Sequence, residues 1–398
     1  MSRIDDLIAD LCPDGVEFRR LGDVVANHDS RRKPVTRGSR VMGAYPYYGA
    51  NGIQDWVSDF IYDGTFLLVG EDGSVLSSSG KPVLNWAMGK IWVNNHAHVL
   101  TALDDSIDLR FLYFYLATVD ISSYVTGGTQ PKLNQGNMNR VPIPIPPLEV
   151  QREIVVILDT FTELEAELEA ELEARKRQYE YYRDALLRLD GKSGIKWIDD
   201  LCPDGVECVA LSDVAGYSSA RIDASKLNET SFVGVDNLVA DKGGRVDASY
   251  LPNTSRLTAY YPGDVLLGNI RPYLKKIWLA NNAGGCSGDV LAIHINKSVR
   301  PVLIPEFLYY LMSSNDFFAY NMQHAKGAKM PRGDKAAILK YVIPFPSLEV
   351  QREIVNVLDK FDALVNDLSI GLPAELAARR KQYEYYRDRL LAFKEASA

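Results

Sequence analysis

The stretch Leu148-Glu-Val-Gln-Arg-Glu-Ile-Val155 occurs a second time in this 398-residue chain, as Leu348-Glu-Val-Gln-Arg-Glu-Ile-Val355. Two further pairs of segments repeat in the same order: residues 11–17 with 201–207, and 178–184 with 382–388. The residues between these pairs hardly match. The chain is therefore one unit of roughly 195 residues used in tandem. We expect its constant frame to present two different surfaces at a fixed separation.

Each copy of this stretch begins a long helical pattern. From Ile154 onward, residues spaced alternately four and three positions apart are apolar or aromatic, except for Glu165 and Arg175. They form a seam along the helix: Ile154, Leu158, Phe161, Glu165, Leu168, Leu172, Arg175, Tyr179, Tyr182, Leu186 and Leu189. Because such a heptad seam needs a partner helix, we expect the two long helices to pair as an antiparallel coiled coil. A parallel pairing, or pairing with other chains, stays open.

The second helical pattern carries four extra residues. The offset between the copies is 200 at Leu348 but 204 at Gln382, and the insertion falls at Gly371-Leu372-Pro373. Proline removes an intrahelical donor, so we expect either a kink or a break with Pro373 in the first turn of a new helix.

The inserts, residues 18–147 and 208–347, read as mixed α/β domains. They contain short β-type runs at 65–69 and 264–267, a helical stretch at 109–118 and at 305–313, and proline-rich exits that favour extended chain. The expected fold class is α+β, with two mixed α/β domains separated by two long helices in a pseudo-two-fold tandem repeat. The expected boundaries are 1–147, 148–190, 191–347 and 348–398.

The overall composition of the chain excludes few classes of protein. The net charge is −8, yet residues 148–190 alone hold 12 acidic against 6 basic residues, so basic faces can exist elsewhere. No apolar run approaches the roughly 20 residues of a membrane span, and the N-terminus resembles no signal peptide, so we expect a cytoplasmic protein without membrane contact. The four cysteines form no CxxC pair and are expected to be reduced.

No catalytic constellation is present in the sequence. Asp190-Gly-Lys-Ser193 ends like a phosphate-binding loop but lacks its first glycine and follows a helix. His96 and His98 alternate in an expected strand without a nearby acidic or cysteine partner, which favours packing or polar surface over a metal site. We therefore expect no catalytic residue, no metal and no cofactor in this chain.

Three segments combine positive charge with glycine, amide or aromatic residues, as DNA-contacting loops do. The first runs from Arg31 through Arg40 into Tyr45-Pro-Tyr-Tyr-Gly-Ala-Asn-Gly52, although a solvated loop with a buried tyrosine cluster is the alternative. The second is Asn269-Ile-Arg-Pro-Tyr-Leu-Lys-Lys276. The third occurs in both copies, at 127–134 and 327–334. It is interpreted either as a loop whose variable side chains contact bases, or as a structural turn whose side chains differ between the copies without a functional reason.

The chain is similar to the specificity subunits of type I restriction-modification systems over nearly its whole length. The resemblance rests on motifs that occur in order: Asp14-Gly-Val-Glu-Phe-Arg-Arg-Leu-Gly-Asp23, Tyr47-Tyr-Gly-Ala-Asn-Gly-Ile53, Asp63-Gly-Thr-Phe-Leu-Leu-Val-Gly70, Gly128-Thr-Gln-Pro-Lys-Leu133, and the proline-led start of each long helix. It implies two target recognition domains that each read half of a bipartite DNA site, about one duplex turn apart.

The same resemblance implies a non-catalytic subunit that assembles with two DNA methylation subunits and two restriction subunits. S-adenosylmethionine, ATP and Mg²⁺ would then belong to those partners. Rival interpretations are a specificity module of another methyltransferase-endonuclease type and a coiled-coil adaptor without DNA.

Candidate DNA contacts come from the segments above and from isolated basic residues. Phosphate contacts are expected from Arg31, Arg32, Lys33, Lys275 and Lys276, and base contacts from Gln130, Lys132, Asn134, Lys329 and Arg332. The remaining candidates are Arg37, Tyr47, Tyr48, Asn51, Lys81, Arg221, Arg271, Tyr273 and Lys326.

Overall fold

The computed structural model describes residues 3–128, 130–367 and 369–396, which form two compact units. Unit 1 comprises Met1–Glu167 with Ala377–Ala398, and unit 2 comprises Leu168–Leu376. Thr129, in the first repeated loop, and Leu368, in the second apolar seam, lie outside the described residues. No helix among the described residues is both long and apolar enough to cross a membrane.

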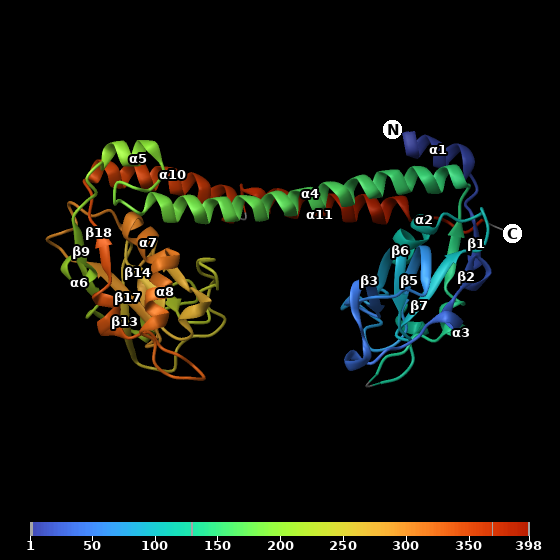
Figure 1. Ribbon diagram of the computed structural model, residues 1–398, viewed down its shortest axis with the longest axis horizontal. Coiled ribbons are helices and arrows are strands. Elements are labelled where there is room, and N and C mark those ends of the chain that lie inside the picture. Colours follow the sequence, from blue (N-terminus) through green and yellow to red (C-terminus); the bar gives the residue numbers. More distant parts are fainter. Residues whose placement is uncertain (1–2, 129, 368, 397–398) are drawn as a thin grey trace. The chain divides into compact units, whose positions relative to one another are not determined.

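Unit 1 is built on a six-stranded sheet with strand order β2-β7-β5-β6-β3-β4 (Figure 1). Its strands are β2 (Val25–Asn27), β3 (Met42–Gly49), β4 (Gly52–Val57), β5 (Tyr62–Gly70), β6 (Leu84–Val93) and β7 (Ala97–Ala102). The predicted run at 65–69 lies inside β5, and from Phe66 on it is buried on both faces, because Leu67 and Val69 pack in one core while Phe66 and Leu68 pack in another.

The remaining elements of unit 1 connect this sheet to the frame. Helix α2 (Leu109–Leu116) confirms the predicted helical stretch, and the proline-rich exit is extended as predicted, with β8 (Pro142–Ile145) pairing antiparallel to β1 (Glu17–Arg20). Shorter elements complete it: α1 (Arg3–Leu11), α3 (Gln135–Met138), and 3₁₀ turns at Leu21–Asp23, Asp29–Arg31, Arg37–Ser39 and Ser122–Tyr124.

Unit 2 keeps the same connections but divides its strands between two four-stranded sheets. One has the order β10 (Ala215–Tyr217), β17 (Val290–Ile295), β14 (Val265–Gly268), β15 (Ile277–Leu279). The other has the order β11 (Arg221–Asp223), β13 (Arg256–Tyr260), β16 (Gly284–Cys286), β12 (Phe232–Val233). The exit strand β18 (Val342–Pro344) again pairs with an entry strand, β9 (Cys208–Ala210).

The helices of unit 2 include the second predicted stretch, which is α7 (Pro305–Ser313). The others are α5 (Lys196–Leu201), α6 (Leu211–Val214), α8 (Asn315–Gln323) and α9 (Lys335–Leu339), with 3₁₀ turns at Ala224–Lys226 and Pro272–Leu274. All four cysteines of the chain are free.

The two long helical patterns behave differently. The first is one helix of 39 residues, α4 (Leu148–Leu186), which contributes to both units. The second is split into α10 (Leu348–Asn366) and α11 (Leu372–Leu390), so Pro373 lies in the first turn of a new helix, the second of the two predicted outcomes. A side chain at Gly371 would collide with the carbonyl oxygens of Ala363 and Leu364, so the glycine lets the linker fold against the end of α10.

Within each unit, part of α4 packs antiparallel to another frame helix. In unit 1, Phe161 stacks on Tyr386 at 5.6 Å between ring centroids, and Arg380 pairs with Glu165 at 2.6 Å. In unit 2, Phe361 stacks in the same way on Tyr182 at 5.8 Å. The repeated frame residues therefore make the same aromatic contact in both units.

A buried glutamine at the start of each long helix connects that helix to its domain. Gln151 accepts a hydrogen bond from the Asp108 amide (2.7 Å) and donates to the carbonyl oxygens of Ser106 (2.9 Å) and Pro146 (2.8 Å). Gln351 makes the same three bonds with Ile304, Val302 and Pro346. The side chain satisfies backbone groups that would otherwise be buried without partners.

We predict that Gln151→Leu destabilises unit 1, because three buried backbone groups lose their partner together. The free energy of unfolding should fall by roughly 2 kcal/mol or more, measured by urea denaturation followed by circular dichroism. The exposed neighbour provides the control, since Arg152→Ala should unfold like the unmodified protein. An unchanged midpoint for Gln151→Leu would show that the bonds contribute nothing.

Candidate nucleic-acid interface

The two repeated loops have the same backbone construction. Gly127 and Gly327 both have positive φ, 88° and 103°, and each opens a turn closed by a β-bridge, Thr126 to Lys132 and Lys326 to Arg332. A further bridge attaches each loop to its own unit, from Lys132 to Asp72 and from Arg332 to Ile270. Different side chains are thus carried on one backbone design.

The residue that ends each loop is a helix cap. Asn134 accepts a hydrogen bond from the Asn137 amide (2.9 Å) at the start of α3, and Asp334 accepts from Ala336 and Ala337 at the start of α9. Asparagine and aspartate are equally good N-caps, which explains the exchange between the copies. The cap uses only the oxygen of the exposed Asn134 side chain, so its role as a base reader stays a prediction.

Lys326 supports the second cap. Its ammonium pairs with Asp334 at 2.5 Å, and this hydrogen bond, with those from the backbone, lowers the pKa of Asp334 to about 2. The carboxylate therefore stays charged at neutral pH, and Lys326 is less available for DNA than its exposure indicates.

A cluster of ionisable groups holds the first loop against the sheet. Asp29, Glu71 and His98 lie close enough to share a metal ion, but cations of the chain already pair with both carboxylates. Arg32 contacts Glu71 at 2.5 Å and Asp29 at 3.4 Å, and Lys132 contacts Glu71 at 3.3 Å. The arrangement therefore favours a structural ion network over a metal site.

His98 joins this network to the loop backbone. Its Nε2 lies 2.8 Å from the Leu133 carbonyl oxygen and its Nδ1 lies 2.5 Å from Asp29. Burial alone would raise the pKa of Asp29, but the hydrogen bond and charge of His98, with the Val99 amide, lower it. Sequence spacing could not reveal this partnership, because the two residues are 69 positions apart.

The tyrosine segment is buried, as the alternative interpretation of the sequence proposed. Tyr47 is only 1% exposed, its hydroxyl bonds to the Val35 amide (2.9 Å), and the Arg40 guanidinium lies 4.1 Å from its ring centroid. Tyr48 is buried with the core of β5 and β6. Both residues are corrected from DNA contacts to core residues.

Polar side chains meet in a pocket of about 380 Å³ in unit 1. It is formed by the β3–β4 turn, the segment after β5, the segment before β7 and the first repeated loop, with lining side chains Asn51, Gln54, Asp72, Ser74, His96 and Gln130. His96 contacts Asp72, and Gln54 accepts from Asn94 (3.4 Å), which leaves its amide N–H groups available. Among the described residues, no lysine or arginine side chain lines the pocket, and its hydrogen-bonding groups fit a base edge better than a phosphate.

The structure thus brings a predicted base reader, Gln130, and a further predicted DNA contact, Asn51, into one pocket. The lining residues Gln54, Asp72 and His96 were not predicted as contacts. The single sequence signal for them is that His96 belongs to a polar run, Asn94-Asn95-His96, at a strand start.

The basic segment of unit 2 is held in a strained turn. Arg271 and Lys275 have left-handed φ values of 51° and 49° on either side of the turn Pro272–Leu274. Lys275 bonds to Asn315 (3.1 Å) and Lys276 to the Val235 carbonyl oxygen (2.7 Å), so both ammonium groups are engaged. Tyr273, between them in sequence, is exposed.

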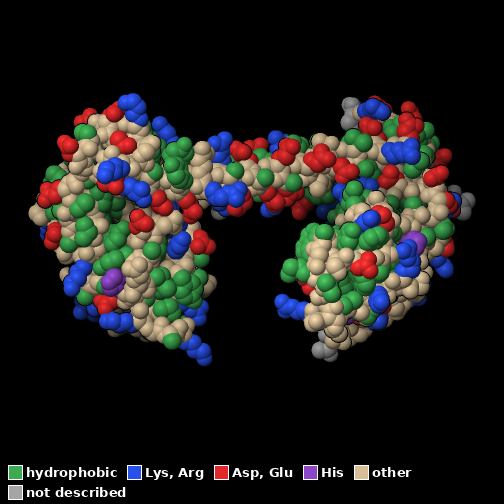
Figure 2. Space-filling view, viewed as in Figure 1, with side chains coloured by type: hydrophobic (Ala, Val, Ile, Leu, Met, Phe, Trp, Pro, Cys, Tyr) green, Lys and Arg blue, Asp and Glu red, His purple; other side chains and the backbone are tan. Residues whose placement is uncertain are grey.

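The other basic candidates fall into two groups. Four have partners or lie in a recess: Arg31 donates to Ile61, Lys81 lines a cavity with Asp388, Arg221 bonds to Thr258, and Arg332 pairs with Asp289 at 3.2 Å. Four are exposed and form no ion pair among the described residues: Lys33, Arg37, Arg271 and Lys329. Figure 2 shows Lys and Arg side chains extending from the end of each unit that lies away from α4, whereas acidic side chains gather on the long helices.

Comparison with known proteins shows a consistent resemblance. Residues 13–174 and 289–378 match the family described as type I restriction modification DNA specificity domain. A putative type I restriction enzyme specificity subunit of Haemophilus influenzae is 33% identical over 95% of this chain and 96% of its own length. The EcoR124I/EcoR124II specificity subunit of Escherichia coli is 27% identical over 83% and 85%.

Solved structures show the same fold. The type I restriction-modification S subunit of M. genitalium superposes with a TM-score of 0.57, covering 94% of this chain and 95% of that one at 15% identity. A chain from a structure of type I restriction-modification complex assembly gives 0.55, with 96% and 98% covered at 18% identity.

We predict that Arg32→Ala lowers the stability of unit 1 by about 2 kcal/mol, because it removes one partner from two largely buried carboxylates. The exposed Lys33→Ala should leave the thermal unfolding midpoint unchanged. The pKa of Asp29 is lowered in the folded protein, so its stabilising contribution is present at neutral pH. That contribution is lost as the pH falls below the ordinary value of 3.8. Equal midpoints for both variants at pH 7 would contradict the network.

Proposed function

Since the chain belongs to the family of type I restriction-modification DNA specificity domains, we propose that each unit reads one half of a bipartite, asymmetric DNA site. The observation that carries this proposal is the pair of repeated loops, which share a backbone design and differ in side chains. A common scaffold with variable contacts is what two different half-sites require.

We divide the DNA contacts into base contacts and phosphate contacts according to where the side chains lie and which of them are exposed. In unit 1 we assign base reading to the polar pocket, where Asn51 and Gln130 offer amide groups that fit adenine or other base edges. Lys33 and Arg37 are assigned to phosphates, since both are exposed. In unit 2, Lys329, Arg271 and Tyr273 are the corresponding exposed candidates.

The helices are assigned the role of spacer and assembly platform. We propose that the antiparallel contacts within each unit belong to one coiled coil with pseudo-two-fold symmetry, and that α4 sets the distance between the half-sites. Two methylation subunits and two restriction subunits would assemble on this frame. The chain itself is proposed to be non-catalytic, with S-adenosylmethionine, ATP and Mg²⁺ bound by those partners.

We expect substitution of a base-reading residue to change sequence preference, and substitution of a phosphate-contacting residue to weaken binding to all sequences. Asn51→Ala and Gln130→Ala should relax preference at positions of one half-site and leave the other half-site unchanged. Lys33→Ala should weaken binding to every sequence and lower the salt slope by about 1. The measurement is competition binding against a library of single-base variants at several salt concentrations, using the full chain with its methylation subunit. Uniform loss for all three variants would contradict the assignment.

Helix α4 provides a second test. Deleting four of its residues, 167–170, shortens it by about 6 Å, nearly two base pairs, and should change the spacer between half-sites. Deleting three residues of the α10–α11 linker, 369–371, should leave the spacer unchanged because these residues lie outside both helices. The spacer is read by sequencing methylated DNA after co-expression with the methylation subunit. If the linker deletion changes the spacer and the α4 deletion does not, the proposed role of α4 is wrong.

A further inference from the structure

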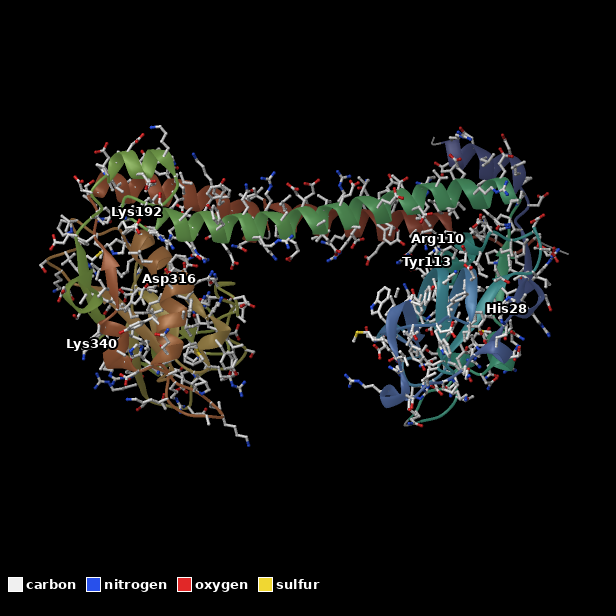
Figure 3. All side chains as sticks on the ribbon, in the orientation of Figure 1. His28, Arg110, Tyr113, Lys192, Asp316 and Lys340 are labelled. Atoms are coloured by element: carbon white, nitrogen blue, oxygen red, sulfur yellow. The ribbon has the colours of Figure 1, made fainter. Side chains whose placement is uncertain are left out.

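Unit 1 holds an arginine in a cage formed by its own side chains. Arg110, near the start of α2, donates to Asp159 of α4 through Nε (2.9 Å) and Nη2 (2.7 Å). Its guanidinium carbon lies 4.9 Å from the Trp86 ring centroid and 4.7 Å from those of Tyr113 and Phe114. Figure 3 shows Arg110 beside Tyr113 beneath the long helix. A carboxylate and three aromatic rings are what a guanidinium prefers.

The buried glutamines identify the equivalent positions in unit 2. Gln151 accepts from the amide two residues before Arg110, and Gln351 accepts from the amide two residues before Glu306. The two helices therefore align with Glu306 in place of Arg110, and with Tyr309 and Tyr310 in place of Tyr113 and Phe114. Asp359 corresponds to Asp159 at the repeat offset of 200. The tryptophans differ: Trp86 packs edge-to-face on Tyr113, whereas Trp278 packs edge-to-face on Tyr260 and lies 5.1 Å from the Arg245 guanidinium.

Unit 2 retains the carboxylate and the two aromatic positions of the helix, but Glu306 stands in the place of Arg110. A groove of about 650 Å³ is lined there by residues that include Trp278, Glu306, Tyr309, Tyr310, Asp359 and Asp362, which we call the unit 2 groove. Among the described residues, Glu306, Asp359 and Asp362 form no ion pair. Asp359 accepts only the Tyr310 hydroxyl (2.6 Å), where Asp159 pairs with an arginine.

The charges around the groove are poorly balanced. Burial raises the pKa of Asp362, although its carboxyl group accepts hydrogen bonds from Tyr179 (3.2 Å) and Asn366 (2.8 Å). Lys242 also lines the groove, but it pairs with Glu180 at 3.3 Å, and burial followed by repulsion from Arg183 lowers its pKa to about 8. The groove thus combines aromatic walls with uncompensated carboxylates.

We propose that the unit 2 groove binds an arginine side chain supplied by a partner protein. The neighbouring copy shows the occupant, since the same helix positions and the same carboxylate already hold a guanidinium there. Guanidinium suits the site better than ammonium, because it stacks on aromatic rings and can bond a carboxylate through two N–H groups. The choice of a partner subunit as the source rests on the proposed function, in which other subunits assemble on this frame.

Two substitutions recreate features of unit 1 and affect the groove in opposite ways. Glu306→Arg supplies an internal guanidinium opposite Asp359, so it should raise the thermal unfolding midpoint and exclude an external arginine. Tyr310→Phe reproduces Phe114 and frees the Asp359 oxygen, so it should tighten binding. Asp359→Asn removes the partner charge and should weaken binding by about tenfold. Glu353→Gln, an exposed change on α10 outside the groove, is the matched control.

The experiment has two arms. In the first, Nα-acetyl-arginine amide and Nα-acetyl-lysine amide are titrated into the full chain and followed by saturation-transfer NMR. We expect the arginine probe to bind more tightly, and Glu306→Arg and Asp359→Asn to abolish or weaken this binding. In the second, assembly with the methylation subunit is measured by analytical ultracentrifugation. We expect both variants to weaken assembly by about tenfold while Glu353→Gln matches the unmodified chain.

The outcomes separate the proposal from its premise. Assembly that is equally tight for Glu306→Arg, Asp359→Asn and the unmodified chain would overturn the role of a partner arginine, even if the free probe binds. A probe that binds every variant equally would overturn the groove as a guanidinium site. Failure of the unmodified chain to assemble or to bind DNA would count against the proposed function, whereas the probe arm would still judge the groove.

Discussion

The constraint on which both units depend is the buried amide of Gln151 and its counterpart Gln351. Each amide uses both donors and its oxygen to satisfy three backbone groups that no secondary structure can pair. These bonds join the start of a long helix, the proline-rich exit strand and the turn before the domain's own helix. The bonds have the same geometry in both copies. Each domain is therefore attached to its own long helix in the same way, although the two domains contain different sheets.

Electrostatic compensation then decides what each surface can do. In unit 1 the cations Arg32, Lys132 and Arg110 are occupied by carboxylates of the chain, and they stabilise a loop and a helix contact. In unit 2 the position of Arg110 is an acid, and a groove with uncompensated carboxylates results. The same frame therefore produces two faces whose difference lies in a few charged positions, which is how a tandem repeat can become functionally asymmetric.

The sequence predicted the elements better than the contacts. Helices α2 and α7, strands β5 and β14, the extended proline exits and the start of α11 near Pro373 all follow from local patterns, because capping, proline geometry and apolar periodicity act over a few residues. The site was predicted less well. Asn51 and Gln130 meet in one pocket, but Tyr47 and Tyr48 are buried, Asn134 is a cap, and Lys132 and Arg32 are ion-paired.

The sequence alone determined that this chain is a tandem repeat with a helical frame and two dissimilar inserts, since exact repetition and heptad spacing are properties of residue order. Only the tertiary structure decided which polar residues are free. The ion pair of Arg32 with Glu71, the contact of His98 with Asp29 and the contacts of Arg110 with Trp86 and Asp159 join residues 24 to 69 positions apart. Their partners are set by how strands and helices pack, and an interaction that depends on folded distance leaves no periodic trace in the sequence.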